Sequence, residues 1–155
     1  MGTRHMNGKK YIISCSIVAE ETFLSGEPVN ILFRLTNQDN RMLYILEWYT
    51  PLEGIAGEIF RVTRDGEEIA YTGRLMKRGD PVLEEYTTLE PGESVSTQVD
   101  LAGCYDMTPE AQYRVEFTSR LFDITDDRSS IPRKRSEHRM QELPCNSAIF
   151  EIMRD

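Results

Sequence analysis

Apolar and polar residues alternate in short segments along most of this chain. The alternation runs through residues 11–17, 31–35, 42–48, 60–71, 95–101, 113–121 and 148–152. A period of two places successive side chains on opposite faces of a β-strand, so each segment is predicted to be a strand with a buried face. Segment 42–48 has apolar residues on both faces and is expected to be buried on both sides. No segment shows the 3.6-residue period of a long amphipathic helix.

Turn-forming residues separate these segments. The sequence NQDN at 37–40 suits a chain reversal. Asp65-Gly66 is a strong hairpin signal, because both central residues of a type I′ turn need positive φ. Pro91-Gly92 fits the centre of a type II turn, and Tyr113 follows PEAQ as in a tyrosine corner. We therefore predict one domain over residues 1–155, an all-β, antiparallel, immunoglobulin-like β-sandwich of seven to nine strands.

Composition limits the kinds of partner and the cellular location. The 155 residues carry a net charge of −8, which disfavours nucleic-acid binding because phosphates would be repelled. No apolar run approaches the roughly 18 residues of a membrane span, so no membrane partner is predicted. The N-terminal MGTRHM lacks the apolar core of a signal peptide, which favours a cytoplasmic location, and residues 1–6 resemble a cloning scar. A signal peptide that had been removed would leave the same sequence.

The three cysteines are predicted to be free thiols. Their odd number argues against a complete disulfide framework. Cys15 is in phase with Ile13 and Ile17 and is interpreted as a buried structural thiol. If the last two strands are antiparallel neighbours, about ten residues at about 3.3 Å each separate Cys104 from Cys145 by roughly 30 Å. A disulfide spans only about 6 Å between α-carbons.

Residues that could carry catalysis or hold a metal are scarce. The only histidines are His5 and His138, whereas an HExxH zinc site needs two histidines one helical turn apart. Nothing near His138 resembles a nucleophile elbow. Asp123, Asp126 and Asp127 lack the spacing and glycine of an EF-hand and are interpreted as a solvated acidic loop. We predict no cofactor, no metal and no enzymatic activity.

Two further segments hold candidate partner-binding residues. Leu52 and Ile55 lie in the loop TPLEGIAG. They either plug one end of the sandwich or lie exposed at the loop tip, where apolar side chains suit partner binding. Residues 122–143 form a long charged loop that starts acidic and turns basic. Its basic part either stays solvated or grips an acidic partner, and its candidate residues are Arg133, Lys134 and Arg135.

Lys77 and Arg78 are also candidates, with two interpretations. They form either a structural ion-pair cluster or a contact surface. Nearby carboxylates that could pair with them are Asp80, Glu84 and Glu85. Residues 78–80 also spell RGD, a tripeptide that some adhesion receptors recognise, but a three-residue match is weak and the structural interpretation is preferred.

An ordered set of short motifs resembles a known domain. The motifs are TPLEG (50–54), F-x-V (60–62), Y-x-G-x-x-x-K-R-x-x-P (71–81), PGES (91–94), VDL (99–101), YD (105–106) and Y-x-V (113–115). This set resembles the immunoglobulin-like N-terminal, non-catalytic domain of the peptidyl-Lys metalloendopeptidases, of the deuterolysin-like aspzincin group. A looser resemblance is to the bacterial intracellular proteinase inhibitors, which share a strand ending in TN, a DG hairpin and an L-x-PGES turn.

The resemblance implies a β-sandwich that accompanies a zinc peptidase. The catalytic motifs of the family, HExxH and a GTxDxxYG-type segment, do not occur in this chain, so no catalytic or zinc-binding residue is carried over. The implied function is a non-enzymatic protein-binding module with a peptidase as partner, and inhibition is one form it could take. The alternative is a structural or self-assembling protein without a peptidase link, which would pair through a sheet edge.

Overall fold

The computed structural model describes residues 10–155, and the expected cloning scar at residues 1–6 lies outside them. The described chain consists of short strands and single-turn 3-10 helices. The strands are β1 (Ile13–Val18), β2 (Thr22–Leu24), β3 (Asn30–Asn37), β4 (Leu43–Leu46), β5 (Phe60–Arg64), β6 (Glu67–Glu68), β7 (Tyr86–Leu89), β8 (Ser94–Asp100), β9 (Ala111–Phe117), β10 (Arg120–Leu121), β11 (Ile124–Thr125), β12 (Gln141–Glu142) and β13 (Ala148–Met153). The 3-10 helices are η2 (Pro51–Glu53), η3 (Leu83–Glu85), η4 (Leu101–Gly103), η5 (Arg128–Ser130) and η6 (Arg135–Glu137). None of the helices described is long and apolar enough to cross a membrane.

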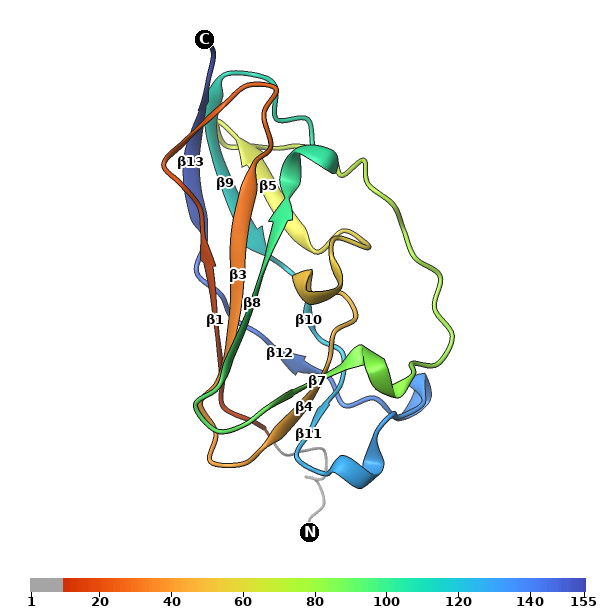
Figure 1. Ribbon diagram of the computed structural model, residues 1–155. Coiled ribbons are helices and arrows are strands. Elements are labelled where there is room, and N and C mark those ends of the chain that lie inside the picture. Colours follow the sequence, from red (N-terminus) through yellow and green to blue (C-terminus); the bar gives the residue numbers. More distant parts are fainter. Residues whose placement is uncertain (1–9) are drawn as a thin grey trace.

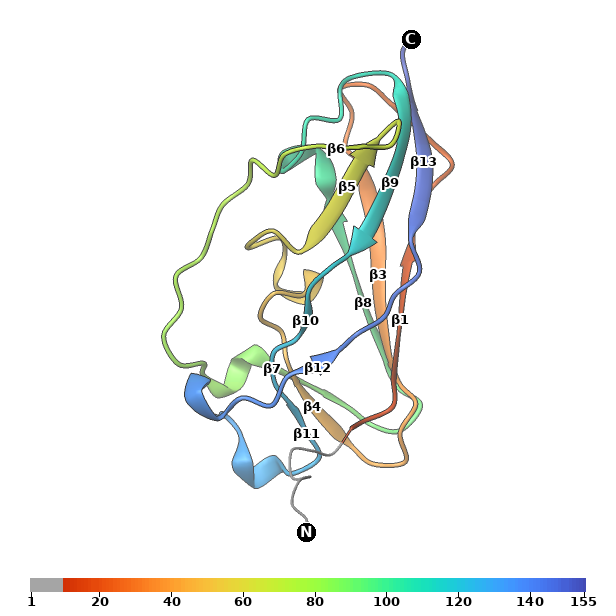
Figure 2. The same ribbon diagram turned by 180° about the vertical axis from the view of Figure 1, so that it is seen from behind.

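Two sheets lie face to face and form a sandwich (Figures 1 and 2). One sheet has the order β1-β3-β8 and is antiparallel throughout. The other has the order β2-β13-β9-β5-β6, in which only the short β2 runs parallel to its neighbour. The predicted all-β, antiparallel sandwich is confirmed. Eight of the described strands have four or more residues, within the predicted seven to nine, and the others have two or three.

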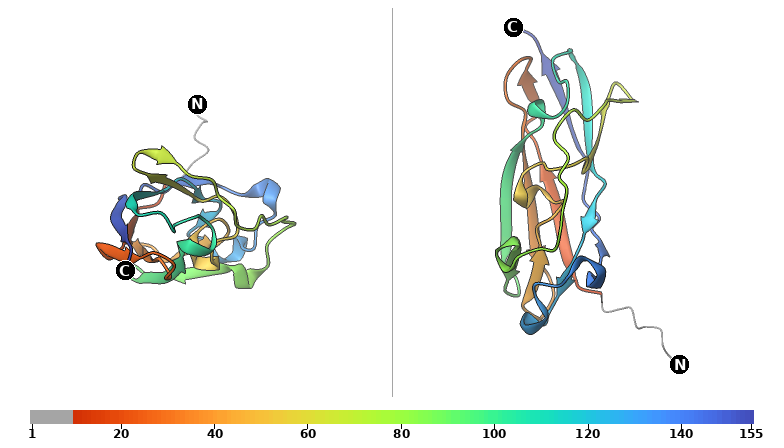
Figure 3. Two further views of the ribbon diagram at one scale, coloured as in Figure 1. Left: turned by 90° about the horizontal axis from the view of Figure 1, so that it is seen from above. Right: turned by 90° about the vertical axis from the view of Figure 1, so that its right-hand side faces the viewer.

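Shorter strands close one end of the sandwich. β4 follows β3 after a turn and pairs with both β7 and β11, while β10 pairs with β12. The side view in Figure 3 shows the two layers edge-on, with this end at the bottom. All four residues of β4 are buried, as the apolar residues on both faces of this segment predict.

Large aromatic side chains fill the space between the sheets. Phe33 of the first sheet packs against Phe117 of the second, with ring centroids 5.5 Å apart. Tyr113 stacks on Phe150 at 5.7 Å, and both are fully buried. The Tyr113 hydroxyl donates to the carbonyl of Pro109 at 2.7 Å, which confirms the predicted tyrosine corner.

Local turn chemistry also follows the sequence. Asp65 and Gly66 have φ values of 49° and 89°, so the β5–β6 hairpin has the positive φ pair expected of a type I′ turn. Gly92 has φ 82° and sits at the third position of the turn before β8. Gly66 and Gly92 both lie in the left-handed region that a Cβ disfavours, which is why glycine occupies these two positions.

A segment without regular structure, residues 69–82, connects β6 to η3 and bows away from the sheets (Figures 1 and 2). We call it the strap. The return strand that the sequence predicts through Ile69 and Tyr71 ends earlier, at Glu68. The reason is that the amide of Thr72 donates to the carbonyl of Cys104, 2.8 Å away, and not to β5, so the chain leaves the sheet.

The prediction of free thiols is wrong for two of the three cysteines. Cys15 and Cys145 form a disulfide with their α-carbons 4.8 Å apart, and Cys104 remains free. Cys15 does lie in phase with the core-facing side of β1, but it is only half-buried. Its partner precedes β13, where the chain passes alongside β1: the Asn146 side chain accepts from the Ile17 amide at 2.9 Å and donates to the Ile17 carbonyl at 2.8 Å.

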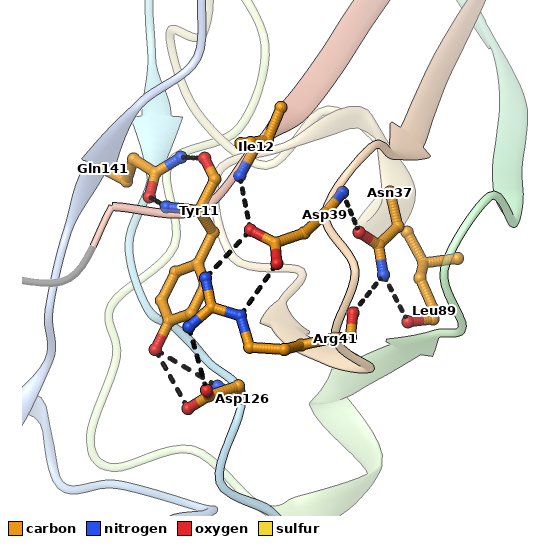
Figure 4. A network of polar contacts seen from close by, with 8 residues as sticks. All are labelled: Tyr11, Ile12, Asn37, Asp39, Arg41, Leu89, Asp126 and Gln141. Atoms are coloured by element: carbon orange, nitrogen blue, oxygen red, sulfur yellow. Dashed lines mark hydrogen bonds and ion pairs between the residues drawn. The ribbon is translucent and has the colours of Figure 1, made fainter.

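A buried carboxylate holds the first strand to the turn after β3 (Figure 4). Asp39 accepts two hydrogen bonds from the Arg41 guanidinium, at 2.8 and 3.0 Å, and one from the Ile12 amide at 3.0 Å. Arg41 also bonds Asp126 at 3.2 Å and lies over the ring of Tyr11 at 4.8 Å. The hydrogen bonds from Arg41 hold the pKa of Asp39 well below its usual range, against the effect of burial.

This shift predicts that acid destabilises the fold. Because the pKa of Asp39 is lower in the folded chain than in the unfolded chain, the unfolded chain binds more protons as pH falls below about 4. The stabilisation is therefore complete near neutral pH and is lost progressively as pH falls from the unfolded pKa toward the lower folded pKa. Urea unfolding of the wild type should show a steeper loss of stability between about pH 5 and pH 3 than that of Asp39→Asn. Equal slopes would contradict this role for Asp39.

Candidate functional site

Arg78 of the strap lies at the centre of an aromatic cluster. Its guanidinium carbon is 4.7 Å from the centroid of the Trp48 ring and 4.6 Å from that of Tyr49. The guanidinium also forms an ion pair with the Glu53 carboxylate, and only 5% of the Arg78 side chain is exposed. Cation–π contacts and a partly buried ion pair thus attach the middle of the strap to the body of the sandwich.

The loop after β4 is shaped to receive this arginine. Tyr49 has φ 57°, a left-handed conformation that is unfavourable for a bulky side chain. The Glu53 carboxylate accepts the Tyr49 amide at 2.7 Å and thereby supports this backbone. Thr50 caps η2 by accepting the Leu52 amide at 3.1 Å. The Glu53 carboxylate is therefore shared between the loop and the strap.

A pocket of about 410 Å³ opens beside Arg78 and the two rings that it contacts. It lies between the strap and the segment before β12. Its lining residues are Trp48, Tyr49, Met76, Arg78, Phe122, Arg135, His138 and Met140. A neighbouring pocket of about 330 Å³ shares three of these residues, namely Tyr49, Met76 and Phe122. We call these two adjacent pockets together the strap groove.

A second buried ion pair fixes the far wall of the strap groove. Asp123 is fully buried and pairs with Arg133 at 2.9 Å. Asp123 also accepts the Tyr86 hydroxyl at 2.6 Å and the Arg139 amide at 2.9 Å. Burial, followed by the hydrogen bond to Asp123, raises the pKa of Tyr86. The hydroxyl therefore stays protonated and remains a donor to the carboxylate.

Residues 122–143, predicted as a long charged loop, contain β11, η5, η6 and β12. β11 pairs with β4, and the chain beyond it returns through Arg133 to the buried Asp123. Arg133 is itself 8% exposed, so it acts within the fold and does not face a partner. Among the described residues, no group of three or more His, Cys, Asp or Glu side chains is arranged to hold a metal ion.

The predicted partner-binding residues are only partly brought together. Arg78 and Arg135 meet, since the Arg135 guanidinium donates to the Arg78 carbonyl. Leu52 and Ile55 are half-buried and pack against the main core, which agrees with the interpretation that they plug one end of the sandwich. Both lysines among the candidates, Lys77 and Lys134, are exposed.

The interpretation of Arg78 as part of a structural ion pair agrees with the structure, but its partner is Glu53, which comes from the loop after β4. Because this side chain is buried between two rings, residues 78–80 do not present an exposed RGD tripeptide. The aromatic and methionine residues of the strap groove were not predicted from the sequence. A signal was available in the pair Trp48-Tyr49, which directly follows a strand and precedes a turn.

The lone described histidine lies in this groove. The His138 ring nitrogen Nε2 is 2.9 Å from the carbonyl oxygen of Arg133, and the ring meets Trp48 edge-on at 5.7 Å. These contacts give His138 a packing role in the wall beside Trp48. The arrangement of the strap groove, aromatic walls with a cationic end, is suited to holding part of another chain.

Comparison with known proteins gives one sequence relative. No protein-family model matches the chain. Over 93 residues, 60% of this chain, it is 33% identical to a protein described as "Extracellular protease" from Aeromonas hydrophila. The match covers 27% of that protein, so the chain spans about a quarter of its relative's length. Part of this chain is similar to part of an extracellular protease. That similarity agrees with the predicted relationship to a peptidase-associated domain, whereas the peptidyl-Lys metalloendopeptidase family stays a prediction.

Two solved structures show a weak overall likeness. Both are of the CARDB domain of a Pyrococcus furiosus protein, one a solution structure and one a crystal structure in complex with di-metal ions. Each has 13% sequence identity and a TM-score of 0.37, with 92% or 93% of this chain and 93% of the other covered. At this level the likeness has no bearing on the function of this chain.

Proposed function

We propose that this chain is a non-catalytic protein-binding domain whose partner is a secreted peptidase. The observation that carries the proposal is the 33% identity over 93 residues with part of an extracellular protease. The chain itself has only two histidines and lacks the HExxH motif, so peptidase chemistry of the zinc type would have to come from another protein or domain. A binding role is supported by the strap groove, whose walls are aromatic and whose rim is apolar.

The disulfide supports an oxidising compartment for this domain. Structural disulfides persist outside the cytoplasm and are rare where thiols are kept reduced. Cys15 and Cys145 are joined in the structure, and the protease to which the chain is similar is described as extracellular. We therefore propose that the domain acts outside the cytoplasm, in place of the cytoplasmic location that the N-terminal sequence favours.

Capture from culture medium tests the proposed partner. The purified domain, immobilised through its C-terminus, is incubated with secreted proteins of its source organism, and the bound proteins are identified by mass spectrometry. We expect a peptidase to be retained and to be displaced by soluble domain. Peptide hydrolysis by that peptidase is then measured with and without excess domain, which separates inhibition from an accessory role. Retention of other proteins alone would overturn the proposal, and retention of the domain's own copies would favour self-assembly.

A further inference from the structure

We infer that the strap groove binds an extended segment of the partner that carries apolar side chains next to a carboxylate. Only the identity of the partner as a peptidase rests on the proposed function. The chemistry of the segment is inferred from the exposed apolar rim of the groove, from the aromatic rings that line both of its pockets, and from the Arg135 guanidinium at one end.

The rim of the groove exposes large apolar side chains that pack poorly against the fold. Leu75 is 78% exposed, Met76 39% and Met140 57%. Leu75 and Met76 belong to the strap, and Met140 comes from the opposite wall. Such side chains gathered around one concavity mark an interaction site more often than isolated exposed residues do. Methionine side chains also adapt readily to different apolar partners.

Two aromatic side chains are common to both pockets of the groove. The rings of Tyr49 and Phe122 are 4.8 Å apart, and both rings line both pockets. A strand-like segment projects alternate side chains toward the same face, about 6–7 Å apart. Two adjacent pockets therefore suit apolar side chains at alternate positions of an extended segment, as in known modes of peptide recognition in which alternate side chains enter successive pockets.

The charge at one end of the groove favours a carboxylate. The Arg78 charge is already matched by Glu53. The Arg135 guanidinium donates to the Arg78 carbonyl, and among residues 10–155 it forms no ion pair. The Asp80 carboxylate lies nearby but accepts the backbone amide of Arg135, at 2.9 Å. Because the whole chain has a net charge of −8, its long-range field would repel an acidic segment. Arg120, which lines the second pocket, is paired with Glu142, so an acidic group would bind through Arg135.

Both walls of the groove are fixed before any segment binds. Glu53 holds Tyr49 and Arg78 on one side, and Asp123 holds the chain at Arg133 and Arg139 on the other. A preformed groove loses little conformational entropy on binding, so even a short segment can bind measurably.

Short peptides with blocked ends test the inference directly. The probes are Leu-Thr-Phe-Thr-Asp and Asp-Thr-Leu-Thr-Phe, which place the carboxylate at either end, each with an Asn counterpart. The domain carries ¹³C-methyl methionine, and chemical shifts are followed during titration. We expect the signals of Met76 and Met140 to move while that of Met153, at the end of β13, stays in place. One Asp peptide should bind about three- to tenfold more tightly than its Asn counterpart.

Two pairs of variants complete the design. Arg135→Gln should remove the preference for Asp over Asn, whereas Arg34→Gln, an exposed arginine on β3, should keep it. Leu75→Ser should weaken the binding of all the peptides. Ile149→Ser, which replaces an aliphatic residue that is 53% exposed on β13, should not. Unmoved Met76 and Met140 signals at several millimolar peptide would overturn the inference, as would a preference for Asp that survives in Arg135→Gln.

The same variants separate this inference from the proposed function. If a secreted peptidase is captured equally well by the wild type, Arg135→Gln and Leu75→Ser, the proposed function stands and the groove is not its binding site. If the peptides bind as expected but no peptidase is captured, the groove inference stands and the proposed function fails.

Discussion

Replacing Cys15 and Cys145 together by serine is expected to lower the free energy of unfolding by about 3–5 kcal/mol. The disulfide joins residues 130 positions apart, so it restricts nearly the whole unfolded chain, and the chain-entropy model gives about 5 kcal/mol for such a loop. The hydrogen bonds between Asn146 and Ile17 hold the same two segments together in the folded state. We therefore expect the variant to keep the native fold and to lose stability mainly through its unfolded state.

Urea unfolding followed by tryptophan fluorescence measures this loss. Cys104→Ser is the matched control, since Cys104 is free and lies outside the disulfide. It should leave the midpoint nearly unchanged, while reduction of the wild type should reproduce the double variant. A loss of less than about 1 kcal/mol in the double variant would show that the unfolded chain is already restricted by other contacts.

Replacing Asp123 by alanine is expected to cost about 3–5 kcal/mol. The carboxylate is fully buried and pairs with Arg133, which is itself 8% exposed. Its removal leaves a buried guanidinium without its counter-charge and the Tyr86 hydroxyl without its acceptor. Because these contacts anchor residues 122–143, amide exchange should increase first in that segment.

A double variant and a surface pair make this prediction specific. Asp123→Asn combined with Arg133→Leu removes both charges and should recover part of the stability lost in Asp123→Ala. Arg120→Ala breaks an exposed ion pair with Glu142, 3.6 Å long, and should cost less than about 1 kcal/mol. If Asp123→Ala costs no more than Arg120→Ala, the buried pair does not hold this segment in place.

The fold could be predicted from the sequence because its signals are local. Apolar alternation marked the strands, and each buried face needed a second layer to cover it, which leads to a sandwich. The turns at Asp65-Gly66 and Gly92 adopt the positive φ that their residue types favour. The strap was harder to foresee, because Ile69 and Tyr71 continue the strand pattern while the Thr72 amide is captured by Cys104.

The candidate site could be predicted only in part, because its residues come from distant segments. Arg78 was identified, but its partners Trp48, Tyr49 and Glu53 follow β4 and carry no sequence signal of a shared site. Arg133 looked like a surface charge in a basic run, yet a buried carboxylate ten positions earlier draws it into the fold. A charged residue in a sequence is usually exposed, but it can be buried when an oppositely charged side chain pairs with it inside the fold.

The sequence by itself therefore determined the all-β class, the hairpins and the tyrosine corner, since alternation, turn residues and a tyrosine bonded to the chain four residues upstream act over short stretches. Tertiary structure alone decided which cysteines join, which carboxylate meets Arg78, and which residues line the two adjacent pockets of the strap groove. These outcomes depend on which segments become neighbours when the two sheets pack. That adjacency is set by the packing of the whole core, and no short stretch of sequence encodes it.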